Sequence, residues 1–350
     1  ASDARIGFFL HIPFPSSEVF RILPEREAVL LGLLGADALA FQTHGHLHNF
    51  RRALLQVLGL ESSFDEVQFE GRAIRFSALP IGIQSEEWED LISADRKVAR
   101  RRAELTQRHA GRKLILSVDR LDYTKGIPER LRTFRRLLKG SPSWRGKVTL
   151  VQIAVPSRER VPAYAELRRE VAELVGEVNG DFGTPEWQPV VYLRRSVNKQ
   201  ELAALYSASD VAWVGPLRDG MNLVAKEYVA CQHGGDGVLV LSEFAGAAQE
   251  LGEALRINPF DEVGTSETIV RALEMEPDLR AERMAALHER VHRNDAVRWA
   301  QRFMEGLREA TGGAQTMHLE RPAPDPEAVR QAFLQAERRL LLLDYDGTLV

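Results

Sequence analysis

Two cationic side chains, Arg120 and Lys125, project from a short polar turn within SVDRLDYTKGIPER, which occupies residues 117–130. An apolar run precedes the turn, and Gly126 and Pro128 mark the start of a helix after it. Fixed cations beside a helix N-terminus, where backbone N–H groups lack partners, form a suitable site for a diphosphate. The alternative is that both side chains pair at the surface with nearby carboxylates, namely Asp119, Asp122 and Glu129. The segment alone favours neither interpretation.

A second polar turn lies within PLRDGMNLVAKEYVAC, residues 216–231, after another apolar run. Asp219 and Gly220 form the turn, and a helix is expected to begin at about Asn222. Gly220 allows the backbone to approach a ligand closely, because glycine has no Cβ. The backbone N–H groups of Met221–Leu223 would lie at the positive end of that helix, where they can hold a phosphate or a sugar hydroxyl.

Two carboxylates in this segment have both a binding and a structural interpretation. Glu227, farther along the helix, could accept a hydrogen bond from a ribose hydroxyl, or it could form a surface ion pair with Lys226 or Arg218. Asp219 could serve a ligand, or it could be a simple turn or cap residue. A further strand-end loop, SEFAGAA at residues 242–248, again places small residues before a helix.

His11 stands at the end of an apolar run in FFLHIPFPSS, residues 8–17, and prolines stiffen the turn after it. Ligands of open α/β sheets bind at the carboxyl ends of strands, so His11 is a candidate binding residue. It could also be a core-edge histidine bonded to backbone, although a mere connection needs no such stiff loop. Arg158 follows another run in QIAVPSR, residues 152–158, and is uninformative alone because an arginine after a strand is usually solvated.

These turns require a framework of buried strands separated by helices. Short runs that are apolar on both faces are typical of strands buried inside a parallel sheet. Amphipathic stretches lie between most of them, which predicts an α/β fold with parallel sheets. The expected strands are Ile6–Leu10, Ala38–Phe41, Ile74–Leu79, Leu114–Val118, Val148–Ile153, Val190–Leu193, Val211–Val214 and Val238–Leu241.

The pattern changes at several points along the chain. We expect a boundary near residues 80–83, then a charged helix over about 85–108, and a new strand–helix series over about 113–257. A last helix is expected to start at a cap formed by Asn294 or Asp295. The apolar face of that helix consists of Ala296, Ala300, Phe303 and Leu307, and an unpatterned linker with Gly and Pro follows over 311–325.

Composition argues against several classes of protein. A net charge of −4 with 27% charged residues is unusual for a protein that binds nucleic acid or a membrane surface, since those usually carry a basic surplus. The single cysteine, Cys231, excludes an internal disulfide bond and is more often a small core residue than a nucleophile. Because we find no run of about 18 apolar residues and no signal peptide, we expect a cytoplasmic enzyme. The chain starts without Met just before one apolar strand and stops just after another, so we expect a fragment of a longer protein.

The chain carries several long motifs in one order and spacing, namely FLHIPFP, RLDYTKGIPERL, PLRDGMNLVAKEYV and SEFAGAAQEL. From Ile6 to Arg308 it closely resembles the trehalose-6-phosphate synthases. The resemblance implies retaining transfer of glucose from UDP-glucose, or another nucleotide-glucose, to glucose 6-phosphate without a metal cofactor. It also implies a GT-B fold of two Rossmann-like domains, the first truncated at its N-terminus. The implied parts are the end of the N-terminal, acceptor-side domain (1–84), the nucleotide-sugar-binding domain (85–290), a cross-over helix (291–310), a linker (311–336) and the first strand of a further domain (337–350).

The resemblance implies a role for each matching residue. Arg120 and Lys125 would bind the donor diphosphate, and His11 would contact the donor glucose; with Asp219 these would be the catalytic residues. The other implied contacts are Asp219 and the backbone of Gly220, Met221, Asn222 and Leu223 with sugar hydroxyls and phosphate, Glu227 with ribose, Ser196 and Val197 with the nucleobase, and Arg158 with the acceptor phosphate.

The far end of the chain, LLLLDYDGTLV at residues 340–350, resembles the first motif of haloacid-dehalogenase-like phosphatases. Asp344 would then be the nucleophile and Asp346 the general acid/base, with Mg²⁺ bridging Asp344 and phosphate. The alternative is an ordinary strand followed by a turn. The resemblance favours a parent protein that combines a synthase with a phosphatase domain, most of which is missing here.

Two other functions fit part of this pattern. A sister glycosyltransferase, such as a glucosylglycerol-phosphate synthase, would use another phosphorylated acceptor. A non-catalytic regulatory subunit is less consistent with intact His11, Arg120, Lys125 and Asp219, which a silent copy would be free to lose. We therefore expect an enzyme of small molecules that is inactive as this fragment alone and that can form homo-oligomers.

Overall fold

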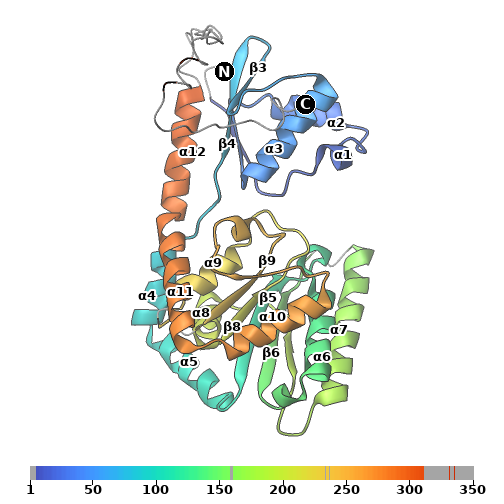
Figure 1. Cartoon of the computed structure of the whole chain (residues 1–350), viewed down its shortest axis with the longest axis vertical. Coiled ribbons are helices and arrows are strands. Elements are labelled where there is room, and N and C mark those ends of the chain that lie inside the picture. The colour runs from blue at the N-terminus through green and yellow to red at the C-terminus, as the bar shows by residue number, and fades with distance from the viewer. Residues whose placement is uncertain are drawn as a thin grey trace. The chain divides into compact units, whose positions relative to one another are not determined.

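The computed structural model describes residues 5–157, 161–232, 234–235, 237–310, 331 and 335, and the statements below refer to these. The described elements belong to one compact unit, residues 1–311. They form a four-stranded sheet and a six-stranded sheet with helices packed against them (Figure 1). None of the described helices is long and apolar enough to cross a lipid bilayer. The expected linker and the expected strand after it fall outside the described residues, apart from 331 and 335.

The smaller sheet and its helices comprise β1 (Gly7–Leu10), α1 (Ser17–Phe20), α2 (Arg26–Leu33), β2 (Ala38–Phe41), α3 (His44–Ala53), a π-helical turn (Leu54–Leu58), β3 (Glu66–Phe69) and β4 (Arg72–Ala78). Its strand order is β1-β2-β4-β3. The pairs β1–β2 and β2–β4 are parallel, as the doubly apolar runs predict. Its core centres on contacting rings of Phe14, Phe41, Phe50 and Phe76, with centroid distances of 5.0 to 6.3 Å.

The β3–β4 hairpin departs from the expectation of parallel sheets. β3 pairs antiparallel with β4, and Phe69 lies opposite Arg72. Between them Glu70 and Gly71 have φ of 50° and 74°, the left-handed region that tight hairpin turns use. The apolar-run criterion misses β3 because Val67 is the only buried residue in that strand.

The larger sheet contains β5 (Lys113–Arg120), β6 (Val148–Val155), β7 (Val190–Leu193), β8 (Val211–Val214), β9 (Val238–Ser242) and β10 (Leu255–Ile257). Its strands are all parallel and their order is β10-β9-β8-β5-β6-β7. This is the doubly wound Rossmann order, in which the chain starts at a central strand and builds outward in both directions. The sequence did not predict β10, a three-residue strand with one buried residue, because so short a segment has no visible pattern.

Helices cover both faces of the larger sheet (Figure 1). These helices are α4 (Ser85–Ala94), α5 (Arg96–Arg108), α6 (Ile127–Gly140), α7 (Pro162–Phe182), α8 (Lys199–Ala208), α9 (Leu223–Ala230), α10 (Glu262–Glu274) and α11 (Pro277–Arg293). Ile115 of β5 packs into the layer under α6, α7 and α10, whereas Leu114 and Leu116 pack into the layer under α4, α5, α8, α9 and α11.

The single charged helix expected over 85–108 is in fact two helices. Asp95 separates them with an extended backbone, φ −83° and ψ 109°. Its Oδ1 accepts hydrogen bonds from the N–H groups of Lys97 and Val98, at 2.7 and 3.4 Å, and so caps α5. The break could not be predicted from the sequence, because charged residues occur on both sides of Asp95 and the pattern does not change there.

Two chain segments connect the sheets, residues 79–84 and residues 294–295. The N–H of Ala296 donates to the carbonyl of Ile83 at 3.0 Å. A Cβ on Gly82 would lie 2.1 Å from the Asn294 carbonyl oxygen, so only glycine fits there. The two segments therefore touch one another, and we call this contact the crossing junction.

The last helix, α12 (Ala296–Ala310), starts at the crossing junction. Asp295, one of the two expected caps, accepts from the N–H of Arg298 at 2.7 Å. The ring of Phe303 would contact a Cβ on Gly7 at 2.9 Å, so α12 packs against β1 of the smaller sheet. Of the expected apolar face, Ala296, Phe303 and Leu307 are half-buried, whereas Ala300 is exposed. The ring of Trp299, which the expected face did not include, lies 5.0 Å from that of Phe9.

Candidate active site

The candidate site lies at the point in the larger sheet where the direction in which successive strands are added reverses. β5 and β8 are neighbours, and from them the chain adds strands outward in opposite directions. The loops that leave the carboxyl ends of two such strands separate, which opens a crevice where ligands of doubly wound sheets bind. These two loops are the ones that carry Arg120 and Lys125 and the Asp219–Leu223 turn.

Arg130, a wholly buried arginine on α6, stabilises the loop after β5 by hydrogen bonds. Its Nη1 donates to Asp119 Oδ2 at 2.8 Å and to Gln152 Oε1 at 3.0 Å, and its Nη2 donates to the Lys125 carbonyl at 3.3 Å. Gly126 follows at φ +64°, a conformation that favours glycine. The Lys125 backbone is therefore fixed on both sides, which gives its ammonium a defined position.

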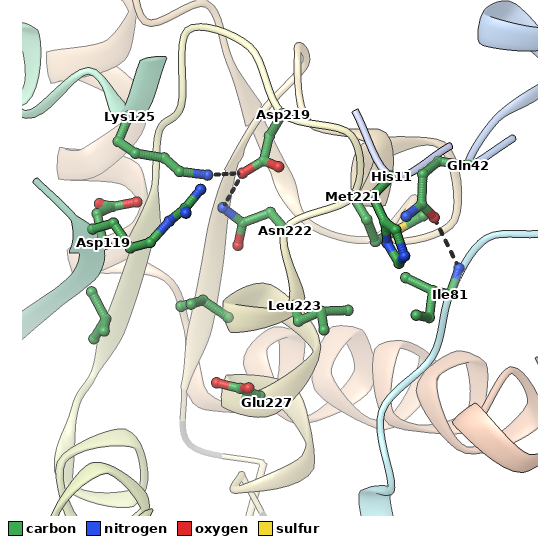
Figure 2. A pocket seen from close by; sticks show the side chains of 13 residues that line it. His11, Gln42, Ile81, Asp119, Lys125, Asp219, Met221, Asn222, Leu223 and Glu227 are labelled. Atoms are coloured by element: carbon green, nitrogen blue, oxygen red, sulfur yellow. Dashed lines mark hydrogen bonds and ion pairs between the residues drawn. The ribbon is translucent and has the colours of Figure 1, made fainter. Parts of the chain in front are cut away.

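The ammonium of Lys125 joins the two loops. Its Nζ lies 2.5 Å from Asp219 Oδ2, and that oxygen also accepts from Asn222 Nδ2 at 3.0 Å (Figure 2). The interpretation that Lys125 pairs with a carboxylate of its own segment is wrong. Arg120 is exposed and has no hydrogen-bond or ion-pair partner among the described residues, so its guanidinium is available.

Gly220 is required by the protein's own packing. A Cβ at Gly220 would lie 1.8 Å from the His11 carbonyl oxygen, and one at Gly246 would lie 1.9 Å from the Gly220 carbonyl oxygen. Three backbone segments, from β1, β8 and β9, are therefore stacked in contact. Glycine is therefore required at 220 by the close approach of the His11 backbone. The expected approach of a ligand to the Gly220 backbone stays a prediction.

Helix α9 begins one residue later than expected, because Asn222 is its cap. Asn222 has φ +76°, and its Oδ1 accepts from the Ala225 N–H at 3.4 Å. The unusual positive φ turns the chain sharply from the Asp219 turn into the helix. The first N–H groups of a helix lack partners within the helix, and here Met221, Asn222 and Leu223 line the cavity.

The two charged residues inside α9 face different surroundings. Glu227 Oε2 accepts from the Tyr206 hydroxyl at 2.9 Å, and burial raises the pKa of Glu227. Lys226 is wholly buried and donates to the Ile81 carbonyl at 2.8 Å and to Glu250 Oε2 at 2.6 Å. A surface ion pair between Glu227 and Lys226 or Arg218, the alternative that the sequence left open, does not form.

The smaller sheet contributes His11 and Gln42 to the same cavity. His11 is exposed, and its ring contacts Phe9 edge-on at 4.8 Å, so it is not a core-edge histidine bonded to backbone. Gln42 Oε1 accepts from the Ile81 N–H at 3.0 Å, which leaves its amide N–H₂ directed to the cavity side. Sequence reasoning missed Gln42, although its place directly after β2, a buried strand, was the signal that identified His11.

The cavity formed in this way has a volume of about 410 Å³. Figure 2 shows Lys125 and Asn222 directed at Asp219 on one side, with His11 and Gln42 on the other. Of the predicted site residues it brings together His11, Arg120, Lys125, Asp219, Met221, Asn222, Leu223 and Glu227, and its lining also includes Gln42, Ile81, Val118, Asp119 and Val224.

Other predicted residues do not line this cavity. Ser196 and Val197 lie in the loop between β7 and α8. Ser196 is exposed, and Val197 packs against the core. Gly220 lies behind the lining, against His11. Arg158, Asp344 and Asp346 lie outside the described residues.

Comparison with known proteins gives one family. The model of glycosyltransferase family 20 matches residues 1–309. The chain is 42% identical over 348 residues to "Alpha,alpha-trehalose-phosphate synthase [UDP-forming] A" of Dictyostelium discoideum, and this alignment covers 99% of the chain and 47% of the relative. It is 42% identical over 357 residues to "Bifunctional trehalose-6-phosphate synthase/phosphatase" of Thermoproteus tenax, covering 100% of the chain and 48% of that protein. The chain thus spans about half the length of these curated relatives.

Solved structures agree in fold. An α,α-trehalose-phosphate synthase (UDP-forming) from Burkholderia xenovorans in complex with glucose-6-phosphate superposes with a TM-score of 0.84 at 40% identity, covering 87% of this chain and 68% of that one. The E. coli protein bound with UDP-2-fluoro glucose gives a TM-score of 0.82 at 40% identity, with the same coverage of 87% and 68%.

Proposed function

This chain belongs to glycosyltransferase family 20 and has the GT-B fold, and we propose that it carries the donor half of an α,α-trehalose-phosphate synthase. The proposed reaction transfers glucose, with retention, from UDP-glucose or another nucleotide-glucose to glucose 6-phosphate. One observation carries the proposal: two cations, the N-terminus of α9, a carboxylate and a histidine converge on one cavity at the switch point of a doubly wound sheet.

The donor diphosphate would lie between the loop after β5 and the start of α9. Lys125 has three N–H donors, of which one serves Asp219, and Arg120 is free of partners among the described residues. These cations and the N–H groups at the N-terminus of α9 would neutralise the charge that develops on the leaving diphosphate. On this basis we propose that transfer needs no metal cofactor.

The glucose would lie between Asp219 and His11. Asp219 Oδ2 is occupied by Lys125 and Asn222, whereas Oδ1 has no partner among the described residues and can accept from a sugar hydroxyl. His11 and Gln42 face the same space from the smaller sheet. If Asp219 holds a sugar hydroxyl in this way, it does not act as a nucleophile. Retention then fits a front-face route in which the leaving phosphate takes the acceptor's proton and the cations stabilise the oxocarbenium-like centre.

The nucleoside and the acceptor would lie at the two ends of this cavity. Glu227, whose Oε1 is not used by Tyr206, would accept from a ribose hydroxyl. We propose that the backbone near Ser196 and Val197 flanks the base and that Arg158 approaches the acceptor phosphate. Since both proposed substrates carry charged phosphates that membranes exclude, we also propose a cytoplasmic enzyme.

We further propose a natural protein in which a phosphatase domain follows this chain. The support is the DYDGT segment with Asp344 and Asp346 and the bifunctional relative from Thermoproteus tenax. Bound Mg²⁺ would supply electrophilic activation of the phosphate ester there.

The test uses the natural protein that contains this chain. Calorimetry with UDP measures the nucleotide half, and a product assay with UDP-glucose and glucose 6-phosphate measures transfer. We expect UDP binding and formation of trehalose 6-phosphate with its α,α configuration. A folded protein that binds no UDP would overturn the phosphate site, whereas UDP binding with transfer only to another phosphorylated acceptor would overturn the proposed acceptor.

A further inference from the structure

A second cluster of ligating side chains lies away from the cavity, between α4 and α11. His288 and His292 stand at positions i and i+4 of α11, so they lie on the same face of that helix. Both face Glu89 of α4. Glu89 Oε1 lies 3.2 Å from His288 Nε2 and 2.5 Å from His292 Nε2. The ligand atoms of the three residues all lie within 4.8 Å of one another.

One carboxylate oxygen thus faces two imidazole nitrogens at once. A metal ion can accept electron pairs from all three atoms together.

We propose that Glu89, His288 and His292 form a binding site for a divalent transition-metal ion of the zinc class. Two imidazoles and one carboxylate are ligands that zinc prefers, whereas Mg²⁺ and Ca²⁺ prefer oxygen alone. Bonds of about 2.0–2.1 Å place the ligand atoms of tetrahedral zinc about 3.3 Å apart. The His288–Glu89 separation of 3.2 Å already matches. The His292–Glu89 pair, at 2.5 Å, would have to open by about 0.8 Å to bind zinc.

The surroundings of the cluster favour such an ion. The Oγ of Ser85, a buried residue, lies 3.5 Å from His292 Nδ1. The other ring nitrogen, Nε2, is therefore the one that would bind the ion. The arginines beside His292 do not repel a cation strongly, because Arg290 pairs with Glu253 and Arg293 pairs with Glu289. The side chain of His292 is 39% exposed, so the fourth coordination position is open to water.

The position of the cluster gives the ion a structural consequence. α4 starts directly after the segment 79–84, and α11 ends directly before residues 294–295, so both helices border the crossing junction. An ion held by Glu89 and the two histidines would cross-link these helices. Because the ion binds the folded protein and the unfolded chain has no such arrangement, it would raise the stability of the folded protein.

The experiment measures Zn²⁺ binding to the purified protein by calorimetry and Co²⁺ binding by visible absorption, which reports tetrahedral coordination. We expect one site, and we expect Glu89→Gln and His292→Gln each to weaken it at least about 100-fold. The matched control is His48→Gln, because His44 and His48 have the same helical spacing on α3 but no third ligand among the described residues. This control should keep the affinity of the unaltered protein.

A second variant separates a metal site from a simple ion pair. His292→Cys removes the histidine of the ion pair but supplies another zinc ligand, so it should retain Zn²⁺ and give a thiolate-to-cobalt charge-transfer band. Circular dichroism without metal checks that each variant is folded. Zinc affinity that is the same in Glu89→Gln, His292→Gln and the control, or loss of the site in a folded His292→Cys protein, would overturn the proposal.

Discussion

Lys125 Nζ and Asp219 Oδ2 lie 2.5 Å apart and join two loops whose residues are 94 positions apart in the sequence. Both side chains are largely shielded, with 13% and 16% of their surfaces exposed. The pair places a cation where β5 and β8 diverge and leaves two of its three donors for a ligand. Arg120 adds a second charge that is neutralised by no described residue.

Arg120→Ala and Lys125→Ala in the natural protein should each reduce transfer far more than stability. A charge-assisted contact of about 1.5–3 kcal/mol corresponds to a loss of about tenfold to a few hundredfold in kcat/KM. Steady-state kinetics measure the first effect and thermal unfolding measures the second. The surface variant Arg100→Ala on α5 serves as the control. Rates within about twofold of the unaltered enzyme would contradict the diphosphate assignment.

Gly220→Ala should disturb the site through the backbone of His11. The added Cβ would lie 1.8 Å from the His11 carbonyl oxygen, so the loop after β1 must move. We expect a loss of about 1–3 kcal/mol in the free energy of unfolding, with a large fall in transfer rate. Gly252→Ala, where no atom lies within 4 Å of the added Cβ, is the matched control. Equal behaviour of the two variants would show that the stacked backbones can separate freely.

Arg130→Met should destabilise the protein strongly because it leaves Asp119 buried without its partner. Breaking a buried ion pair of this kind costs about 3–5 kcal/mol. Arg135→Ala should cost far less, because the Arg135 side chain is 42% exposed in its pairs with Glu177 and Asp181 and solvent screens both pairs. Urea denaturation measures both. The same loss in both variants would mean that Asp119 finds another partner or water.

Glu227→Gln should alter the dependence of stability on pH. Burial raises the pKa of Glu227 above its ordinary value of 4.5, so the folded state holds this proton more tightly than the unfolded state. Stability therefore falls as pH rises from about 4.5 through the folded-state pKa, and the neutral amide removes that contribution.

The same variant should bind the nucleotide less well, since an amide replaces the charged acceptor. We expect UDP affinity to fall by about tenfold or more, while stability at neutral pH stays the same or rises. Unfolding across a pH series and calorimetry provide the two measurements, with Glu86→Gln at an exposed position of α4 as control. Unchanged UDP affinity in a folded variant would remove Glu227 from the ribose site.

Chelation should leave glucosyl transfer intact. Arg120, Lys125 and the N-terminus of α9 would supply the positive charge, and the Asp219 oxygen nearest to them is already paired with Lys125. With EDTA at a temperature well below unfolding, we expect the rate of trehalose 6-phosphate formation to stay the same, whereas the proposed phosphatase should stop. Transfer that is lost on chelation and restored by Mg²⁺ would contradict this mechanism.

Much of the framework was predictable because its signals are local. Doubly apolar runs identified the central strands, and β2, β7 and β8 have the expected bounds. Turn and cap residues such as Gly126 and Asp295 act within a few positions of themselves, so their role can be inferred from neighbours. By contrast β3 pairs through a half-exposed face, and Asp95 interrupts a charged stretch without changing its composition. Neither leaves a periodic signal.

The arrangement of the site was decided by tertiary structure. The sequence supplied Lys125 and Asp219 as separate candidates, but only the neighbouring positions of β5 and β8 make them partners. The sequence predicted a close approach of a ligand to Gly220, and only the fold shows that the His11 carbonyl also lies against this glycine. Gln42 and Glu89 carry no motif, and they acquire meaning only from Ile81 and from the two histidines of α11. Contacts of this kind join residues distant in the chain, and their geometry depends on how whole sheets and helices pack, which no local pattern encodes.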